Sequence, residues 1–404
     1  MSRRAAANLV LAVIAVAGAI VGAILLSKTT IPGDLKTPKI DVAREFAGTD
    51  LGDAAAFERL LRWTFIGSQV TLVVVLALYA KHGARYVRDS AAGPIGTGFL
   101  LGMLGLAFVW IAQLPFHVVD YWWAHKHDVV EVGWFDFLFG DWLALSAQFL
   151  FVCFALLLAM GFARRLARTW WLPAAAAFVA LTLLFAYISP LLASGLRDPK
   201  GPQLRAEAAE IARKEGVPSI PLKVEEVHEI TDAPNAYAFG LGSTRKVVLW
   251  DTIVGFPRPQ VRVVIAHEYG HQAHHHIIKS VGWTALVLIP TALLVSLLTR
   301  RRGGMARPEA VPVALLVFIV LTIVATPLES AASRRFEREA DWSALRTTRD
   351  PAAMKGLFQR FTSEALADPD PPGWYHALFD DHPSGAERVA MAKAWAAREG
   401  VPVP

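Results

Sequence analysis

The segment from Val264 to His276 has the sequence VIAHEYGHQAHHH, which places five histidines and one glutamate in thirteen residues. In a helix, side chains four residues apart lie on the same face, so the imidazoles of His267 and His271 can reach one metal ion. Glu268 stands beside them, where a carboxylate can take a proton from water that the metal activates. The segment therefore predicts a metal site. Its ligand types favour Zn²⁺, one ion per chain, although iron and manganese accept similar ligands.

The predicted helix around this segment, residues 259–278, has further features. Three residues give it an apolar side: Val261, Val264 and Ile265. Gly270 lies inside it, where glycine costs helix stability unless close packing requires it. Of the last three histidines, His275 follows His271 by four residues and could extend the metal-binding face. We instead expect residues 274–276 to form a polar helix end near the membrane surface.

The composition is that of a membrane protein. The chain has 404 residues, of which 54% are hydrophobic and 19% are charged, and its mean hydropathy is +0.39. A membrane-spanning helix requires about 20 apolar residues. Seven stretches are candidates: 8–27, 64–80, 95–115, 141–162, 170–194, 281–299 and 311–328. The predicted fold class is mainly α, a seven-transmembrane-helix bundle in the lipid bilayer.

Two polar regions, 195–280 and 329–404, interrupt or follow these spans. The first contains an amphipathic pattern at 200–216 that ends at Gly216 and predicts a helix. Two β-rich runs, 221–230 and 244–250, predict a small sheet. Between the two runs lies APNAYAFGLGS, whose composition by itself favours a turn.

The distribution of basic residues predicts the orientation and excludes one class of partner. The N-terminus and the loops at 81–94, 163–169 and 300–310 together carry 12 lysines and arginines, whereas the opposite loops, 28–63 and 116–140, carry 7. Because cytoplasmic loops are the more basic ones, we expect a multi-pass protein of the cell membrane with a cytoplasmic N-terminus. Both polar regions would then lie on the other side. The net charge of +5 comes from clusters beside apolar runs, which indicate lipid headgroups and not nucleic acid.

The third metal ligand must come from another part of the chain, because a catalytic zinc is held by three protein side chains. After His271 the chain crosses the membrane twice and returns to the same side. The polar helix predicted there, residues 333–346, carries Glu337 and Asp341 four residues apart. Glu337 can serve as ligand and Asp341 can accept the free N–H of a ligand histidine. Spacing alone leaves Glu339 open as the ligand, and a solvated charged face is the alternative.

Several motifs together resemble one known family. They are APNAYAFG (233–240), VVLWDTI (247–253), HEYGH (267–271), a two-span hairpin, SRRFEREAD (333–341) and DDHPSGAERV (380–389). Their order is similar to that of the type I CAAX prenyl endopeptidases, which are integral-membrane zinc metallopeptidases of the gluzincin group. The resemblance covers roughly residues 190–395. The Ala- and Arg-rich composition indicates a prokaryotic member.

The resemblance implies a zincin-like metalloprotease domain with a small β-sheet, built from two segments. The implied division is 1–194 for transmembrane helices one to five, 195–280 for the first part of that domain with the HExxH helix, 281–328 for helices six and seven, and 329–404 for the second part with the third zinc ligand. The family's metal-binding glutamate opens its ExxxD motif. This assigns Glu337 as ligand in preference to Glu339, with Asp341 behind it.

The resemblance also implies roles for four further residues. Asn235 and Ala236 match an edge strand that binds extended substrate backbone. His382 matches a histidine that stabilises the oxyanion, and Arg388 matches an arginine near the site. Without the resemblance, His382 and Arg388 would be interpreted as surface residues.

The function expected is therefore peptide-bond hydrolysis by a membrane-embedded zinc metalloendopeptidase, acting on a peptide or membrane protein with or without a lipid group. The main alternative is a quality-control protease without prenyl specificity. A transporter that uses His117, Asp120 and His125 is a rival from another class. A zinc-stabilised inactive scaffold is a further rival, but such a scaffold would have no use for Glu268.

Overall fold

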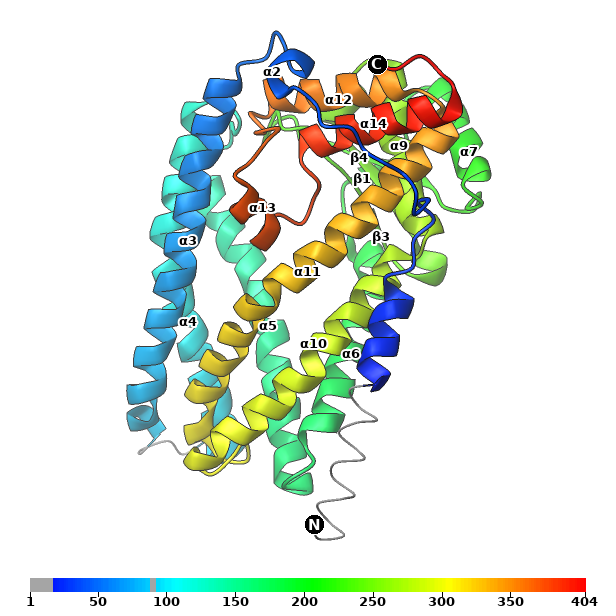
Figure 1. Ribbon diagram of the computed structural model, residues 1–404. Helices are drawn as coiled ribbons and strands as arrows, with labels where there is room; N and C mark the ends of the chain where they lie inside the picture. The colour runs from blue at the N-terminus through cyan, green and yellow to red at the C-terminus, as the bar shows by residue number, and fades with distance from the viewer. Residues whose placement is uncertain (1–16, 88–91) are drawn as a thin grey trace.

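The protein is described by a computed structural model that covers residues 17–87 and 92–404 (Figure 1). Within these residues six helices are long and apolar enough to cross a membrane. They are α3 (Leu51–His82), α4 (Gly93–Lys126), α5 (Trp134–Leu166), α6 (Trp171–Leu192), α10 (His276–Thr299) and α11 (Val311–Thr348). Five of these helices contain the predicted spans 64–80, 95–115, 141–162, 281–299 and 311–328, and α6 accounts for all but the ends of the predicted span 170–194.

The first predicted span, 8–27, lies partly outside the described residues. Its described part is a short apolar helix, Ala17–Leu26, which packs against α10. A Cβ atom added to Gly282 of α10 would lie 2.7 Å from Cδ2 of Leu26. Glycine at this position therefore permits the close approach of the two helices.

Helix α11 combines two predicted elements. The seventh predicted span and the polar helix expected at 333–346 form one helix, Val311–Thr348, with Pro327 inside it. The segment after Pro327 is rich in Ala, Glu and Arg, which favour helix, and no glycine or proline ends it before Thr348. One continuous helix therefore leads from the apolar end of the molecule to the predicted third ligand.

The sheet has four short strands: β1 (Leu196–Arg197), β2 (Leu222–Glu225), β3 (Ala236–Phe239) and β4 (Lys246–Trp250). Their spatial order is β1-β2-β4-β3. Strands β2 and β4 are parallel, whereas β3 pairs antiparallel with β4. The prediction of a turn between the two predicted strands is therefore wrong, because part of this segment forms the edge strand β3.

Helices cover this sheet and complete the polar end of the molecule (Figure 1). They are α7 (Pro202–Lys214), α8 (Asp251–Val254), α9 (Arg258–Ala273), α12 (Pro351–Glu364), α13 (Gly373–Leu378) and α14 (Gly385–Glu399). The two polar regions share one apolar core, in which Ile211, Leu249, Ile265, Leu345 and Trp395 have at most 1% of their surface exposed. This shared core supports a domain built from two segments, and the boundaries given above stay predictions.

Residues 27–50, here called the strap, run from the first described helix across α11 and α14 to α2 (Val42–Glu45) (Figure 1). Glu45 at the end of α2 is buried. Its carboxylate accepts from Lys355 Nζ at 2.8 Å and from Lys393 Nζ at 2.6 Å, and these contacts hold the strap on α12 and α14.

The loops that follow α3, α5 and α10 lie at the end of the molecule opposite to the C-terminus (Figure 1). These are the basic loops of the sequence. These basic loops share one end of the molecule, as the orientation expected from their lysines and arginines requires. The sheet lies towards the opposite end. Which end faces the cytoplasm stays a prediction.

Candidate metal centre

The histidine helix α9 is positioned by its apolar face and by one glycine. Val261, Val264 and Ile265 are buried in the core, as the sequence predicts. A Cβ atom added to Gly270 would lie 3.1 Å from Cβ of Ser343 and 3.4 Å from Cα of Ala340. Glycine therefore lets α9 lie directly against α11, which is the packing reason that its place inside a helix requires.

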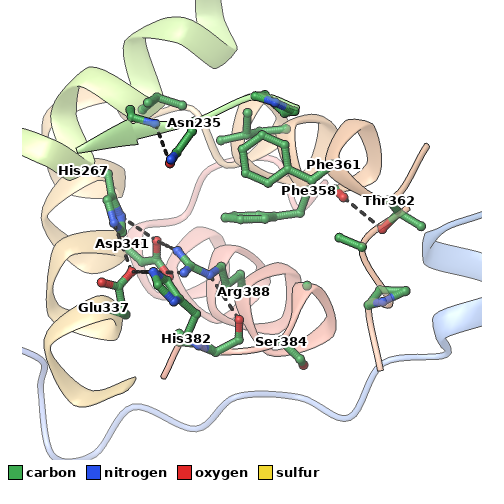
Figure 2. Close-up of a pocket in the computed structure, with 18 of the residues that line it drawn as sticks. Asn235, His267, Glu337, Asp341, Phe358, Phe361, Thr362, His382, Ser384 and Arg388 are labelled. Atoms are coloured by element: carbon green, nitrogen blue, oxygen red, sulfur yellow. Dashed lines mark hydrogen bonds and ion pairs between the residues drawn. The ribbon is translucent and has the colours of Figure 1, made fainter. Parts of the chain in front are cut away.

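This packing brings the three predicted ligands together. Nε2 of His267 lies 3.2 Å from one carboxylate oxygen of Glu337, and Nε2 of His271 lies 3.3 Å from the other. The two Nε2 atoms are 3.0 Å apart. One ligand atom from each of the three residues lies within 4.8 Å of the others. Figure 2 shows His267 and Glu337 side by side at the wall of the pocket.

The hydrogen bonds at the far side of each ring decide whether a metal fits. Nδ1 of His267 donates to Oδ1 of Asp341 at 2.9 Å, so its Nε2 carries a lone pair. The Nδ1 of His271 lies 2.9 Å from Nδ1 of His276, and donation from His271 in this contact leaves its Nε2 with a lone pair as well. Two lone pairs and a carboxylate directed at one point repel one another unless a cation lies between them. The donor set, two imidazoles and one carboxylate, fits zinc.

Glu268 lies next to these donors and lines a cavity of about 360 Å³ together with His267, Asn235, His382 and Arg388. Its side chain is buried. Burial raises the pKa of Glu268 above its ordinary value, because a carboxylate loses hydration in an apolar setting. A carboxyl group with a raised pKa is a better proton acceptor than an exposed one, which suits general acid–base work.

Arg388 is not a surface charge but a buried partner of the site. Its Nη1 donates to Asp341 at 2.8 Å, its Nη2 to Glu337 at 3.1 Å, and its Nε to the carbonyl of Pro383 at 3.3 Å. Both predicted carboxylates are thus fixed by one guanidinium (Figure 2). The geometry favours positioning of Glu337 and Asp341, and substrate contact by Arg388 stays a prediction.

His382 lies in the loop between α13 and α14, with Nε2 at 3.5 Å from Glu337. Its Nδ1 donates to Asp381 at 2.7 Å. Desolvation lowers the pKa of His382, but the hydrogen bond and charge of Asp381 and the charge of Glu337 outweigh it, so the pKa is raised. A raised pKa favours the imidazolium, which can donate to a developing negative charge.

Strand β3 offers a free edge beside the donors. The carbonyl of Asn235 accepts from Trp250 N in β4 at 3.0 Å. Because backbone groups alternate along an antiparallel pair, those of Ala236 and Ala238 point away from β4. The outward N–H of Ala236 is bonded to the side chain of Asn235 at 2.8 Å. Asn235 and Ala236 therefore lie on the cavity wall where an extended peptide could pair.

The positions of His276 and Glu339 behind the metal centre could not be predicted from the sequence. The helix expected at 259–278 ends at Ala273; His275 has φ 56° and α10 begins at His276. No glycine or proline marks this break, so the pattern could not reveal it. His276 is consequently buried, not at a polar helix end. Glu339, left open as a ligand, bonds to His276 instead.

The residues of the transporter hypothesis lie elsewhere. His117, Asp120 and His125 all belong to α4. Asp120 accepts from the hydroxyl of Thr64, and His125 contacts the carbonyl of Val130 at 2.8 Å. None of the three lines the metal-site cavity.

Comparison with known proteins gives the family. The sequence profile of peptidase family M48 matches residues 199–396, which include all the residues of the metal centre. The uncharacterized metalloprotease YhfN of Bacillus subtilis is 24% identical in an alignment of 394 positions that covers 91% of each chain. A protease HtpX homolog of Methylibium petroleiphilum is 28% identical over 48% of this chain and 74% of its own. A CAAX prenyl protease 1 homolog of Dictyostelium discoideum is 25% identical over 43% of each chain.

The fold has a counterpart among solved structures. The crystal structure of S. mikatae Ste24p superposes with a TM-score of 0.71 over 95% of this chain and 98% of its own, at 18% identity. At this identity the likeness shows a shared fold. Together with the matched profile and the cluster of His267, His271 and Glu337, these comparisons show that the chain belongs to peptidase family M48 and is a membrane zinc metalloprotease that hydrolyses peptide bonds.

Proposed function

We propose that this metalloprotease cleaves peptide segments that lie extended along β3, with His267, His271 and Glu337 as the zinc ligands. The observation that carries the proposal is the convergence of these three donors beside a cavity that His267, Glu268 and Glu337 line. Asn235 and Ala236 at the start of β3 line the same cavity, and the backbone groups of Ala236 and Ala238 point away from β4. When bound, zinc supplies Lewis acidity that activates water and polarises the scissile carbonyl.

Glu268 acts as the base and then as the acid. Its carboxylate takes a proton from the attacking water as the water oxygen bonds to the carbonyl carbon. It returns this proton to the leaving nitrogen as the C–N bond breaks. The upward shift in its pKa favours the first transfer, because the group holds a proton more readily than an exposed glutamate does.

His382 stabilises the charge that develops on the carbonyl oxygen. Its Nδ1 is held by Asp381, so the Nε2–H of the imidazolium is free to donate towards the cavity. Arg388 keeps Glu337 and Asp341 in place. The cavity wall beyond His267 contains Ile253, Val264, Leu357, Phe358 and Phe361, which suits an apolar substrate side chain (Figure 2).

The variant Glu268→Gln tests this mechanism. It keeps the size of the side chain and removes the proton acceptor, so turnover should fall about 10³-fold. Zinc content, measured by elemental analysis of the purified protein, should equal that of the parent. Cleavage at the parental rate would show that Glu268 is not the base.

Prenyl recognition is the narrower form of this function. It is supported by the similarity to a CAAX prenyl protease 1 homolog and by the fold shared with Ste24p. A general membrane-protein protease is the alternative, because the names of the metalloprotease YhfN and of the protease HtpX homolog imply no prenyl specificity. A panel of matched peptides with and without a prenyl group separates the two: equal cleavage indicates the general protease, and a strong preference for the prenylated peptides indicates the CAAX-type enzyme.

A further inference from the structure

The third histidine of the HHH triplet, His276, contacts a proposed metal ligand. Its Nδ1 lies 2.9 Å from Nδ1 of His271. The two rings are nearly perpendicular, at 79°, with centroids 4.9 Å apart. His276 is 3% exposed, and the ring of Phe336 stacks on it at 4.9 Å. This side chain is therefore part of the interior behind the metal centre.

The contact depends on the break between α9 and α10. In a continuous helix a residue five positions after His271 would be rotated by roughly 140° around the axis and would face away from it. His275 adopts a left-handed conformation, with φ 56°. For a non-glycine residue this conformation is uncommon and costs energy. The turn redirects the chain so that His276 lies against His271.

The direction of each hydrogen bond follows from chemistry. If Nε2 of His271 is a zinc ligand, its Nδ1 carries the proton and must donate. Nδ1 of His276 must then accept, so the proton of His276 is on Nε2. That Nε2 lies 3.1 Å from a carboxylate oxygen of Glu339, which accepts it. The bonds thus run in one direction, from His271 through His276 to Glu339.

Glu339 is anchored at the end of this chain of hydrogen bonds. It is 1% exposed, and its charge is compensated by Nζ of Lys279 at 3.1 Å. Its other oxygen accepts from the backbone N–H of Thr30 in the strap at 2.6 Å. Lys279 also donates to the carbonyl of Lys28 at 3.3 Å. The strap therefore closes over the end of the network.

The two histidine ligands are supported in parallel ways. His267 donates directly to Asp341, whose charge is matched by Arg388. His271 reaches Glu339 through His276, and the charge of Glu339 is matched by Lys279. A carboxylate behind a histidine ligand fixes its orientation and raises its basicity, and its loss costs about 10- to 100-fold in metal affinity.

We propose that His276 and Glu339 are positioning residues that hold His271 as a zinc ligand, and that the strap completes this support at Thr30. The proposal rests on the assignment of His271 as a ligand in the proposed function. It gives the third member of the HHH triplet a task in metal retention.

A pair of variants at one position tests the proposal in the full-length protein in detergent. His276→Phe keeps a ring and removes the acceptor, whereas His276→Gln supplies an amide oxygen as acceptor and an amide N–H as donor. Zinc affinity is measured by competition with a chelator. We expect His276→Phe to lose 10-fold or more and His276→Gln to recover most of that loss. The visible spectrum of the Co²⁺-substituted protein should change in the Phe variant and resemble the parent in the Gln variant.

Two further variants guard against a purely structural effect. His275→Asn alters the exposed neighbour in the triplet, keeps a residue that tolerates the left-handed conformation, and should leave zinc affinity within about twofold of the parent. Glu339→Gln keeps the shape of the side chain and should weaken zinc several-fold, even if His276→Phe fails to fold. Unchanged zinc affinity in His276→Phe, or in Glu339→Gln if the former does not fold, would overturn the proposal. Because zinc binding is measured without substrate, a protein that binds zinc but cleaves no peptide would refute the proposed function alone.

Discussion

Arg388 shows how one buried side chain can hold two carboxylates of a site in place. Its guanidinium spans the two carboxylates that define the metal centre, Asp341 and Glu337, and it is itself buried. A lysine cannot reproduce this two-armed geometry. Loss of the guanidinium leaves two buried negative charges without a cation, which is strongly destabilising.

We therefore predict that Arg388→Met lowers zinc affinity and destabilises the protein by about 3 kcal/mol, with Arg388→Lys intermediate. Chelator competition and thermal unfolding measure the two effects. If Arg388 mainly binds substrate, as its family position implies, the variants would instead raise KM and leave zinc affinity as in the parent.

At the residue level, the sequence predicted what local spacing determines. His267, Glu268 and His271 are adjacent or four apart on one helix, and Glu337 and Asp341 are four apart on another. Spacing left Glu339 open as the third ligand, and the family resemblance favoured Glu337, which the structure brings to the two histidines. The contact of His276 with His271 could not be predicted, because it depends on a left-handed residue that no glycine marks. The burial of Arg388 also depends on tertiary packing between α11 and α14.

Among the helices and strands, the proposed substrate binding depends on the edge strand β3. Its outward backbone groups belong to alternate residues, Ala236 and Ala238, so only every second substrate amide can pair with it. Composition favoured a turn here, since the strand has only four residues and follows Pro234 and Asn235. Pairing with β4 overrides that local preference.

This alternation predicts a result with modified substrates. Methylation of a substrate amide that pairs with β3 should weaken binding about 5- to 10-fold, the value of one hydrogen bond. Methylation of the neighbouring amides should have little effect on binding. A scan of N-methylated peptides, read as kcat/KM, should therefore show a period of two residues. Equal sensitivity at all positions would argue against pairing along this edge.

For the whole molecule, the strap connects the bilayer end to the metalloprotease end. Glu45 is its buried anchor, and hydrogen bonds from Lys355 and Lys393 lower the pKa of Glu45 to about 2. A carboxylate whose pKa is depressed by folding contributes its full stabilisation above the ordinary pKa near 4.5. That contribution is lost as the pH falls towards the folded-state value.

We predict that Glu45→Gln destabilises the protein at pH 7 by about 2 kcal/mol, because two lysines lose a charged partner. The difference from the parent should shrink as the pH falls from about 4.5 towards 2. Thermal unfolding of both proteins in detergent across this range measures it. A difference that stays constant down to low pH would contradict the role of the Glu45 charge.

The arrangement of the long helices could be predicted from the sequence only in part. Long apolar runs are a strong signal, and six of them form helices where expected. The continuity of α11 through bilayer and metal centre was not predicted, because a change from apolar to polar composition resembles the end of a helix. The continuity of α11 matters for function, because the same helix that contains the seventh predicted span also carries Glu337, the proposed third ligand.

The most direct measurement of the central claim is an anomalous difference map at the zinc absorption edge from crystals of the zinc-loaded protein. The account predicts one peak per chain, about 2.0–2.2 Å from Nε2 of His267, from Nε2 of His271 and from a carboxylate oxygen of Glu337. A peak coordinated by other side chains, or zinc-loaded protein with no peak between these three residues, would contradict it.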